Sequence, residues 1–358
     1  MRILHIITSL QLGGAETLVT NLLPRIKDNG CEVGLVVFNG EKTELMDYLE
    51  QVTPTCKIHR FGNSYYNPWY IIKLIGVMRK YDIIHTHNSS PQLFAAIANI
   101  ICRKKLVTTE HSTNNRKREQ GVLLRMIDKW MYRQYDQVIC ISKIAEDKLR
   151  TYLGVNNKCN ICTINNGVDI ESFNQAKPLE GLKTSKFTIV MVAGFREAKD
   201  QDTLICAISL LPKGQYELLL VGDGVRRAEL EQLTDSLNIR EFVKFLGFRS
   251  DVPRILKTAD VIVMSSHWEG LSLSSIEGMA AEKPFVASNV IGLREVTRDA
   301  GILFPEGDAR ALAHIIEQLS NNQAFYQQVA YQCNERAKQY DIRKTVEGYL
   351  HVYKSLTS

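Results

Sequence analysis

The sequence predicts an α/β protein made of two Rossmann-like, doubly wound domains that face a cleft. Short, almost continuously apolar runs alternate with amphipathic stretches along the 358 residues. This is the pattern of parallel strands that are buried on both faces and joined by helices. The alternation stops at a polar stretch, 171–186, and then begins again. A chain of this length is expected to form two domains of roughly 150–200 residues each.

The first half contains five apolar runs that predict buried strands. These strands are expected at 2–8, 31–38, 82–86, 106–110 and 137–141. The amphipathic stretches between them predict helices that start near Ala15 and span 92–101, 121–132 and 143–152. Because helices connect the strands, the sheet is expected to be parallel with right-handed crossovers.

The second half repeats this organisation. Its predicted strands are 187–193, 217–221, 243–246, 260–264, 284–287 and 301–304. Its predicted helices are 202–211, 225–237, 274–281 and the tail from Ala309 onward. We expect an N-terminal domain at 1–175, a C-terminal domain at 185–340, and a helix at 341–358 that packs back toward the N-terminal domain. Ligands of such sheets bind outside the carboxyl ends of the strands.

The composition is that of a soluble globular protein, with 45% apolar and 23% charged residues. No apolar run approaches the ~20 residues that span a bilayer. The apolar N-terminus lacks a cleavage pattern and reads as a first strand, not as a signal peptide. Eight scattered cysteines favour a reducing compartment, and the lone pair Cys159 and Cys162 has no second pair for zinc. We therefore expect a cytoplasmic protein.

Basic residues gather between 103 and 133, where nine basic residues meet three acidic ones. No nucleic-acid-binding motif accompanies them, so nucleic acid is not an expected partner. An anionic membrane surface, at the inner face of the membrane, is the expected partner of this segment. A merely solvated helix face stays open as the alternative.

The turn after the first predicted strand contains two adjacent glycines, Gly13 and Gly14. It resembles a phosphate-binding turn, in which glycine lets the backbone approach a ligand. The GxGxxG pattern is absent, which argues against a nicotinamide-dependent dehydrogenase. We expect Gly14 to line a binding turn, while a purely structural role for the glycines stays open.

Two glutamates flank the start of a predicted helix in the second half. Glu269 follows a buried strand, and Glu277 lies eight residues later, inside the helix. Residues 270–273 form the helix start, whose free N–H groups attract a phosphate or a sugar oxygen. A carboxylate beside Ile276 and Met279 is costly to bury without a partner. A ligand role for Glu277 therefore competes with a structural cap or ion pair.

With these residues the chain resembles the retaining glycosyltransferases of family 4, which have the GT-B fold. The Glu-x7-Glu signature of that family corresponds to Glu269 and Glu277. Further similar segments in the second half are 192–200, 221–224, 245–252, 289–295 and 301–308. Looser matches in the first half are 13–16, 85–87, 110–112 and 166–169. The resemblance covers nearly the whole chain and is strongest over 190–308.

The resemblance implies a role for each matching residue. Glu277 would bind the ribose hydroxyls of a nucleotide-sugar donor, and Glu269 would contact hydroxyls of the transferred sugar. Lys199 would neutralise the departing diphosphate, and the region around Arg249 would face the base. His111 would reach the sugar from the opposite domain. The backbone N–H groups that would touch sugar and phosphate belong to Gly270, Leu271, Ser272 and Leu273.

The chain departs from the family pattern at Gly194. The family commonly has an arginine there, five residues before Lys199. Arg196 stands two residues further along, and we interpret it as the second positive contact. The alternative is that Lys199 acts alone and activity is low or lost. Ser272 also replaces a frequent glycine, which is a milder change.

The segment Asp200-Gln201-Asp202 spells the metal-binding DxD of glycosyltransferases with another fold. Here it opens a predicted helix, where aspartate is favourable as a cap and toward the helix dipole. We therefore expect no metal and no other cofactor.

The sequence thus predicts a hexosyltransferase-type enzyme of polysaccharide or glycoconjugate biosynthesis. It would transfer a sugar with retention from a nucleotide diphosphate sugar, with UDP as the expected carrier, to a glycan or lipid-linked acceptor. The expected catalytic residues are Lys199, Arg196, Glu269 and His111. Two alternatives remain: a non-catalytic sugar-nucleotide-binding protein, and a nucleotide-sugar epimerase with a similar fold.

Overall fold

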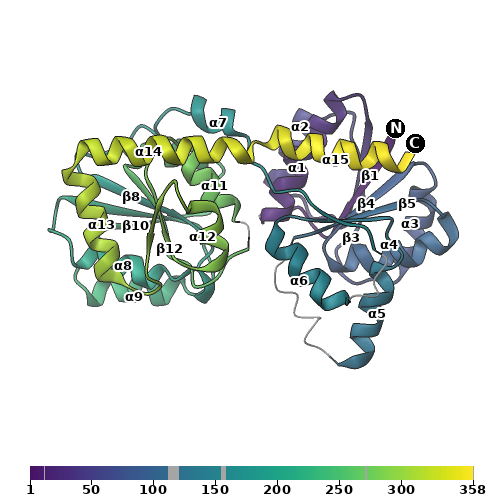
Figure 1. Ribbon diagram of the computed structural model, residues 1–358, viewed down its shortest axis with the longest axis horizontal. Helices are drawn as coiled ribbons and strands as arrows, with labels where there is room; N and C mark the ends of the chain where they lie inside the picture. The colour runs from purple at the N-terminus through teal and green to yellow at the C-terminus, as the bar shows by residue number, and fades with distance from the viewer. Residues whose placement is uncertain (12, 112–120, 155–158, 271, 358) are drawn as a thin grey trace. The chain divides into compact units, whose positions relative to one another are not determined.

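The computed structural model describes residues 1–11, 13–111, 121–154, 159–270 and 272–357. It divides the chain into two compact units, which are described one at a time (Figure 1). The first unit contains Met1–Gly167 and Ile342–Ser358, and the second contains Val168–Asp341. The sequence places the end of the N-terminal domain at residue 175, whereas the structure divides the chain after Gly167.

The first unit is built on a seven-stranded parallel sheet with the order β3-β2-β1-β4-β5-β6-β7. Its strands are β1 (Arg2–Ile7), β2 (Glu32–Asn39), β3 (Lys57–Gly62), β4 (Ile83–His87), β5 (Lys105–Glu110), β6 (Gln137–Cys140) and β7 (Ile161–Thr163). The strand order reverses between β1 and β4, so this unit has a topological switch point at its centre.

Helices cover both faces of this sheet. They are α1 (Gly14–Asp28), α2 (Glu44–Val52), α3 (Trp69–Met78), α4 (Ser89–Cys102), α5 (Val122–Tyr132), α6 (Lys143–Leu153) and α15 (Ile342–Thr357). Alternate residues of β1 enter two separate apolar clusters: Ile3 and Ile7 pack on one face, and Leu4 and Ile6 on the other. This is why the strand reads as a continuous apolar run in the sequence.

The C-terminal helix α15 packs against α1 within the first unit (Figure 1). It buries Tyr349 and Tyr353 in the core. The chain passes close to itself where this helix begins, because a Cβ atom at Gly167 would lie 2.8 Å from the backbone of Ile342. Glycine is therefore needed at this approach.

The second unit is built on a six-stranded parallel sheet with the order β10-β9-β8-β11-β12-β13. Its strands are β8 (Phe187–Val192), β9 (Tyr216–Val221), β10 (Val243–Gly247), β11 (Val261–Met264), β12 (Phe285–Ser288) and β13 (Ile302–Phe304). Its helices are α7 (Ile170–Gln175), α8 (Gln201–Ser209), α9 (Arg227–Ser236), α10 (Val252–Thr258), α11 (Leu273–Ala280), α12 (Ile291–Thr297), α13 (Ala309–Asn321) and α14 (Gln323–Ala337).

The two doubly wound α/β units that the sequence predicts are confirmed, and each predicted strand is present. The sequence missed β3 and β7, which are the two edge strands of the first sheet. Their side chains are mostly half-buried or exposed, and β3 includes Lys57 and Arg60. Edge strands of this kind lack the apolar run that marks a buried strand.

Candidate active site

The strand order of the second unit reverses between β8 and β11, which pair with each other. Ligands of open parallel sheets bind outside the carboxyl ends of the strands at such a reversal. The segments that follow these two strands are 193–200 and 265–272, and they carry most of the predicted site residues. Leu271 lies outside the described residues.

Lys199 and Glu269 form an ion pair between Nζ and Oε1. The same carboxylate oxygen accepts a hydrogen bond from Ser266 Oγ at 2.8 Å. The side chain of Glu269 is only 9% exposed, whereas that of Lys199 is 25% exposed. The lysine is therefore the more accessible member of the pair. Ser266 belongs to this candidate site by its contact with Glu269, and the sequence pattern contains no signal for it.

Two further contacts tie the segment after β8 to the segment after β11. Ser265 Oγ donates to the carbonyl oxygen of Asp200 at 2.6 Å, and the backbone N–H of His267 donates to the carbonyl oxygen of Ala198 at 3.0 Å. These bonds set the two loops in register, so that Lys199 meets Glu269. The sequence pattern contains no signal for them.

Glu277 lies on α11, which begins directly after the loop that carries Glu269. Among the residues that the structure describes, none forms a hydrogen bond or ion pair with its carboxylate. The surrounding protein desolvates the carboxylate and raises its pKa to about 7. The structural cap or ion pair that competed with a ligand role is thus not found in the described chain. A ligand that donates hydrogen bonds would favour the ionised form.

The start of α11 follows Glu269 and Gly270 closely. Ser272 is the N-cap residue, but its side chain makes no capping hydrogen bond. Gly292, from the segment after β12, packs against this loop so tightly that a Cβ atom would lie 2.3 Å from the carbonyl oxygens of both Glu269 and Gly270. Leu273, the first residue of α11, is half-buried. Glycine is therefore needed at position 292 for this close approach.

Arg196 is exposed, and its backbone N–H donates to the carbonyl oxygen of Gly194 at 2.9 Å. A Cβ atom at Gly194 would lie 3.9 Å from Arg196 Nε and 3.7 Å from the carbonyl oxygen of Asp223. These are ordinary van der Waals distances, so the position has space for a side chain. The guanidinium group of Arg196 thus begins beside the place where the family's arginine would stand.

The two carboxylates of the Asp-Gln-Asp segment have structural partners. Asp200 caps α8, because its side chain accepts hydrogen bonds from the backbone N–H of Thr203 at 3.2 Å and from its hydroxyl at 2.6 Å. Asp202 forms a two-pronged ion pair with Arg226, at 2.6 and 2.9 Å. Asp200 is thus the cap of a helix start, and Asp202 lies in the first turn of the same helix, as the sequence predicts.

Arg249 follows β10 and pairs with Asp251, at 2.8 and 2.6 Å. This pair, through hydrogen bonds and charge attraction, raises the pKa of the guanidinium group. The neighbouring Phe248 is 65% exposed. A flat, exposed aromatic ring beside a paired arginine is the arrangement on which a base can stack.

The first unit carries His111 directly after β5 and a cluster of histidines beneath it. His87 Nδ1 lies 2.9 Å from His111 Nε2, and His87 Nε2 lies 3.0 Å from His5 Nδ1. Burial lowers the pKa of His111 to about 4 and that of His5 to about 3. These rings are therefore neutral at pH 7.

Nitrogen atoms of His5, His85 and His87 lie within 4.8 Å of one another, which is a spacing that a metal ion could use. Each ring nitrogen of the three already has a hydrogen-bond partner in the core. A metal would have to displace these bonds. Hydrogen bonding therefore accounts for the cluster, whose sequence signal is the histidine pair of β4.

Gly14 is the first residue of α1, and Gly13 is its N-cap. A Cβ atom at Gly13 would lie 2.4 Å from Glu16 Oε2, and Asn88 Nδ2 donates to the other oxygen of Glu16 at 3.4 Å. Asn88 directly follows β4 and has a φ of 69°. The glycine turn and the end of β4 thus meet at the switch point of the first sheet.

Two family models match the chain. The one described as Glycosyltransferase Family 4 matches residues 12–172, and the one described as Glycosyl transferases group 1 matches residues 172–340. EpsD of Bacillus subtilis, a protein named as a glycosyltransferase, is 30% identical over 295 residues, which are 76% of this chain and 76% of EpsD. The chain belongs to glycosyltransferase family 4.

Another relative and a solved structure are similar to this family 4 glycosyltransferase over nearly its whole length. The N-acetylgalactosamine-N,N'-diacetylbacillosaminyl-diphospho-undecaprenol 4-alpha-N-acetylgalactosaminyltransferase of Campylobacter jejuni is 26% identical over 356 residues, which are 94% of each chain. The crystal structure of HepE from Anabaena in complex with UDP-glucose matches with a TM-score of 0.84 and 23% identity, covering 99% of this chain and 100% of HepE. This likeness confirms the GT-B fold.

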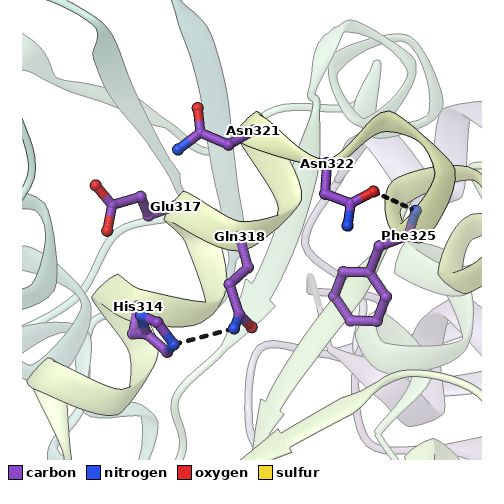
Figure 2. Close-up of a pocket in the computed structure, with 6 residues that line it drawn as sticks. All are labelled: His314, Glu317, Gln318, Asn321, Asn322 and Phe325. Carbon is purple, nitrogen blue, oxygen red and sulfur yellow. Dashed lines mark hydrogen bonds between the residues drawn. The ribbon is translucent and has the colours of Figure 1, made fainter.

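A hollow lies at the junction of α13 and α14 of the glycosyltransferase (Figure 2). The residues that line it are His314, Glu317, Gln318, Asn321, Asn322 and Phe325. Asn322 Oδ1 accepts a hydrogen bond from the backbone N–H of Phe325 at 3.0 Å, and Gln318 Nε2 lies 3.0 Å from His314 Nε2. None of the predicted site residues lines this hollow, so it is a feature of the helix corner.

Helix α5 of the glycosyltransferase exposes several large apolar side chains. Those at least half exposed are Val122, Leu123, Leu124 and Met126, with exposed fractions of 66, 70, 50 and 63%. The basic side chains on or directly after this helix are Arg125, Lys129 and Arg133. Residues 116–118, which are also basic, are outside the described residues. No helix in the described part of the chain is long and apolar enough to cross a membrane.

Proposed function

We propose that this glycosyltransferase moves a hexosyl group, with retention, from a UDP-sugar to a lipid-linked glycan in polysaccharide or glycoconjugate biosynthesis. The observation that carries the proposal is Glu277. Its carboxylate has a pKa raised to about 7 and no partner in the described chain. Glu277 lies on α11, directly after the loop that carries Glu269. The two ribose hydroxyls of a nucleotide are suitable donors to such a carboxylate.

The positive groups of the second unit fit the leaving group. When the bond between the anomeric carbon and the diphosphate breaks, its electron pair goes to the diphosphate oxygen. Lys199, Arg196 and the N–H groups at the start of α11 would stabilise that charge. In the retaining reaction the acceptor oxygen attacks from the face that the diphosphate leaves, and the diphosphate oxygen takes the acceptor's proton.

We propose that the reaction needs no metal and no other cofactor. Asp200 and Asp202 have structural partners, Thr203 and Arg226. The charge of the leaving diphosphate would instead be met by cationic side chains and a helix end. Support for UDP comes from HepE of Anabaena, whose structure holds UDP-glucose.

Titration calorimetry with UDP tests the donor site. Glu277→Gln is expected to weaken binding about ten-fold or more, because a hydrogen bond to a charged group contributes about 1.5–3 kcal/mol. Glu241→Gln, an exposed glutamate of the same unit, is the matched control and should leave affinity unchanged. Unchanged affinity in folded Glu277→Gln contradicts the assignment.

Turnover assays with UDP-sugars and lipid-linked acceptors then separate the remaining functions. Transfer to the acceptor supports the proposal. Nucleotide binding without transfer would instead support a non-catalytic binding protein, the alternative that Gly194 raises. Interconversion of donor sugars without an acceptor would support an epimerase.

We also propose that the protein acts at the cytoplasmic face of a membrane and that α5 docks on it. The enzyme of Campylobacter jejuni is named for a diphospho-undecaprenol acceptor, which is a lipid. The apolar side chains of α5 would enter the lipid interface while its basic side chains meet anionic headgroups, each contributing about 1 kcal/mol. Charge and apolar exposure on one helix therefore support an anionic bilayer as the partner.

Co-sedimentation with vesicles of phosphatidylglycerol at low salt tests this docking. Leu123→Ser combined with Met126→Ser is expected to abolish most of the binding. Tyr331→Ser removes a similarly exposed side chain, 68% exposed, from α14 of the second unit and should not affect binding. A protein that stays in the supernatant with anionic vesicles would contradict the membrane proposal.

A further inference from the structure

A row of hydrogen bonds leads from His111 into the core of the first unit. His111 Nε2 lies 2.9 Å from His87 Nδ1, and His87 Nε2 lies 3.0 Å from His5 Nδ1. His5 Nε2 lies 3.5 Å from the hydroxyl of Tyr353 on α15. His87 and His5 are thus each linked at one nitrogen to the ring before it and at the other to the group after it.

The row continues beyond Tyr353. Its hydroxyl lies 2.5 Å from His85 Nδ1, and His85 Nε2 lies 2.8 Å from Thr109 Oγ1. Thr109 in turn bonds the hydroxyl of Tyr349 at 2.9 Å. Side chains from β1, β4, β5 and α15 therefore form one connected network. All of its members other than His111 are fully or almost fully buried.

The protons of this network are not independent of one another. Burial lowers the pKa of all four histidines, including His85 and His87, so the rings are neutral. Burial also raises the pKa of Tyr353, which keeps its proton. A neutral imidazole has one N–H donor and one lone pair. If donor and acceptor are exchanged in one hydrogen bond of the row, the tautomer of every histidine in the row must therefore change with it.

Tyr353 decides the direction in which the protons point. Its hydroxyl lies 2.5 Å from His85 Nδ1 and 3.5 Å from His5 Nε2, and O–H donors make the shorter hydrogen bonds. We therefore assign the hydroxyl proton to the bond with His85, which leaves the oxygen to accept from His5 Nε2–H. His5 Nδ1 then accepts from His87 Nε2–H, and His87 Nδ1 accepts from His111 Nε2–H. The last nitrogen, His111 Nδ1, therefore carries a lone pair.

That last nitrogen is buried and has no hydrogen-bond partner within the described chain. We propose that His87, His5 and Tyr353 are positioning residues that hold His111 in the tautomer with the proton on Nε2. His111 Nδ1 then offers a lone pair to a hydroxyl of the transferred sugar. Only the identity of this hydroxyl rests on the proposed function, because the tautomer follows from the contacts of the unliganded chain.

Nitrogen NMR of protein labelled with 15N in its eight histidines measures the tautomer directly. His111→Gln identifies the resonances of His111. We expect a protonated Nε2 and an unprotonated Nδ1 for His111 at pH 7. His87→Phe, which removes the acceptor, is expected to give a mixture of the two tautomers. A protonated Nδ1 in the unchanged protein would overturn the proposal.

Two tyrosines provide a matched pair of substitutions. Tyr353→Phe removes the hydroxyl that orders the network, whereas Tyr135→Phe removes an equally buried hydroxyl of the same unit that bonds Thr86 and the carbonyl oxygen of Gln92. Tyr353→Phe is expected to shift the resonances of His5 and His111, and Tyr135→Phe is not. Equal spectra for the two variants would overturn the proposal.

Kinetics distinguish positioning from mere stability. His87→Phe is expected to lower kcat about ten-fold, the effect of one lost hydrogen bond, while UDP affinity stays unchanged. His87→Asn keeps a carbonyl oxygen near the place of Nδ1 and should recover part of the loss. A chain that shows the expected tautomer but transfers no sugar would contradict the proposed function alone. Full activity in His87→Phe would contradict the positioning role alone.

Discussion

The ammonium group of Lys199 and the carboxylate of Glu269 meet although 70 residues separate them in the chain. The pair joins the loop after β8 to the loop after β11, at the reversal of the strand order. Because Glu269 is nearly buried and Ser266 holds it in place, it acts as a fixed anchor for the lysine. The lysine is therefore oriented before any ligand arrives, and this saves ordering entropy during binding.

Removal of this positive charge should slow the chemical step. Lys199→Ala is expected to lower the single-turnover rate of transfer about 10²-fold or more, because the leaving diphosphate loses its stabilisation. Lys257→Ala breaks a similar pair, with Glu282, away from the site and serves as the control. A folded Lys199→Ala variant that keeps its rate would show that the charge is supplied elsewhere.

The compensation between Arg196 and Gly194 can be tested in both directions. Arg196→Ala is expected to lower transfer about 10²-fold, since a preorganised positive contact is lost. Adding Gly194→Arg to that variant should restore much of the rate, because the position has space for a side chain. Steady-state assays of the transfer rate test both variants. If Arg196→Ala transfers sugar at the unchanged rate, Arg196 does not replace the family's arginine and Lys199 stabilises the diphosphate alone.

Donor affinity should rise with pH because of Glu277. Its pKa is raised to about 7, so the carboxylate is mostly protonated at pH 6 and mostly ionised at pH 8. In the proposed site the ionised form would accept the ribose hydroxyls, so the affinity for UDP-glucose should increase about ten-fold from pH 6 to pH 8. Calorimetry checks this with a ligand whose diphosphate has no proton to lose in that range. Glu277→Gln should bind independently of pH, and a pH-independent parent protein would refute the role.

Transfer should continue after exhaustive treatment with EDTA. The reason is that Asp200 caps a helix and Asp202 pairs with Arg226. The assay compares the initial rate before and after dialysis against the chelator. Loss of activity that manganese or magnesium restores would contradict the proposal of metal independence, and the three-histidine group of the first unit would then be the next place to examine.

The buried histidines should make the first unit sensitive to acid. Their pKa values are low in the folded chain, about 3 for His5 and about 4 for His111, but ordinary in the unfolded chain. The unfolded state therefore binds more protons below about pH 6.5, and stability falls as the pH decreases from there toward 4. Each such histidine lowers the free energy of unfolding by up to about 1.4 kcal/mol for each unit by which the pH falls in that range.

Thermal unfolding at pH 7.5 and pH 5.0 measures this effect. Trp268→Phe leaves Trp69 and Trp130 as fluorescent reporters of the first unit. In that background His5→Gln should reduce the difference in Tm between the two pH values. His351→Gln, an exposed histidine on α15, should leave the difference unchanged. Equal pH dependence of these two variants would argue against the neutral, buried histidine network.

Burial explains which elements could be predicted. Runs such as 217–221 are fully buried, because β9 lies inside its sheet, and they stand out in the sequence. The edge strands β3 and β7 are partly exposed and were missed. In the site, Glu269 and Glu277 were recognisable by their spacing along one loop and helix. Ser266 and Gly292 were not, because their importance comes from packing against other segments.

The sequence by itself determined the two α/β units, the buried strands and the local order of the residues around Glu269, because apolar periodicity and motif spacing are properties of neighbouring residues. Only the tertiary structure decided which side chains meet. Lys199 reaches Glu269 because β8 and β11 are adjacent in the sheet, and His85 meets Tyr353, 268 residues away, because α15 returns to the first unit. In a parallel sheet the carboxyl ends of distant strands share one edge, and linear spacing does not encode which of them are neighbours.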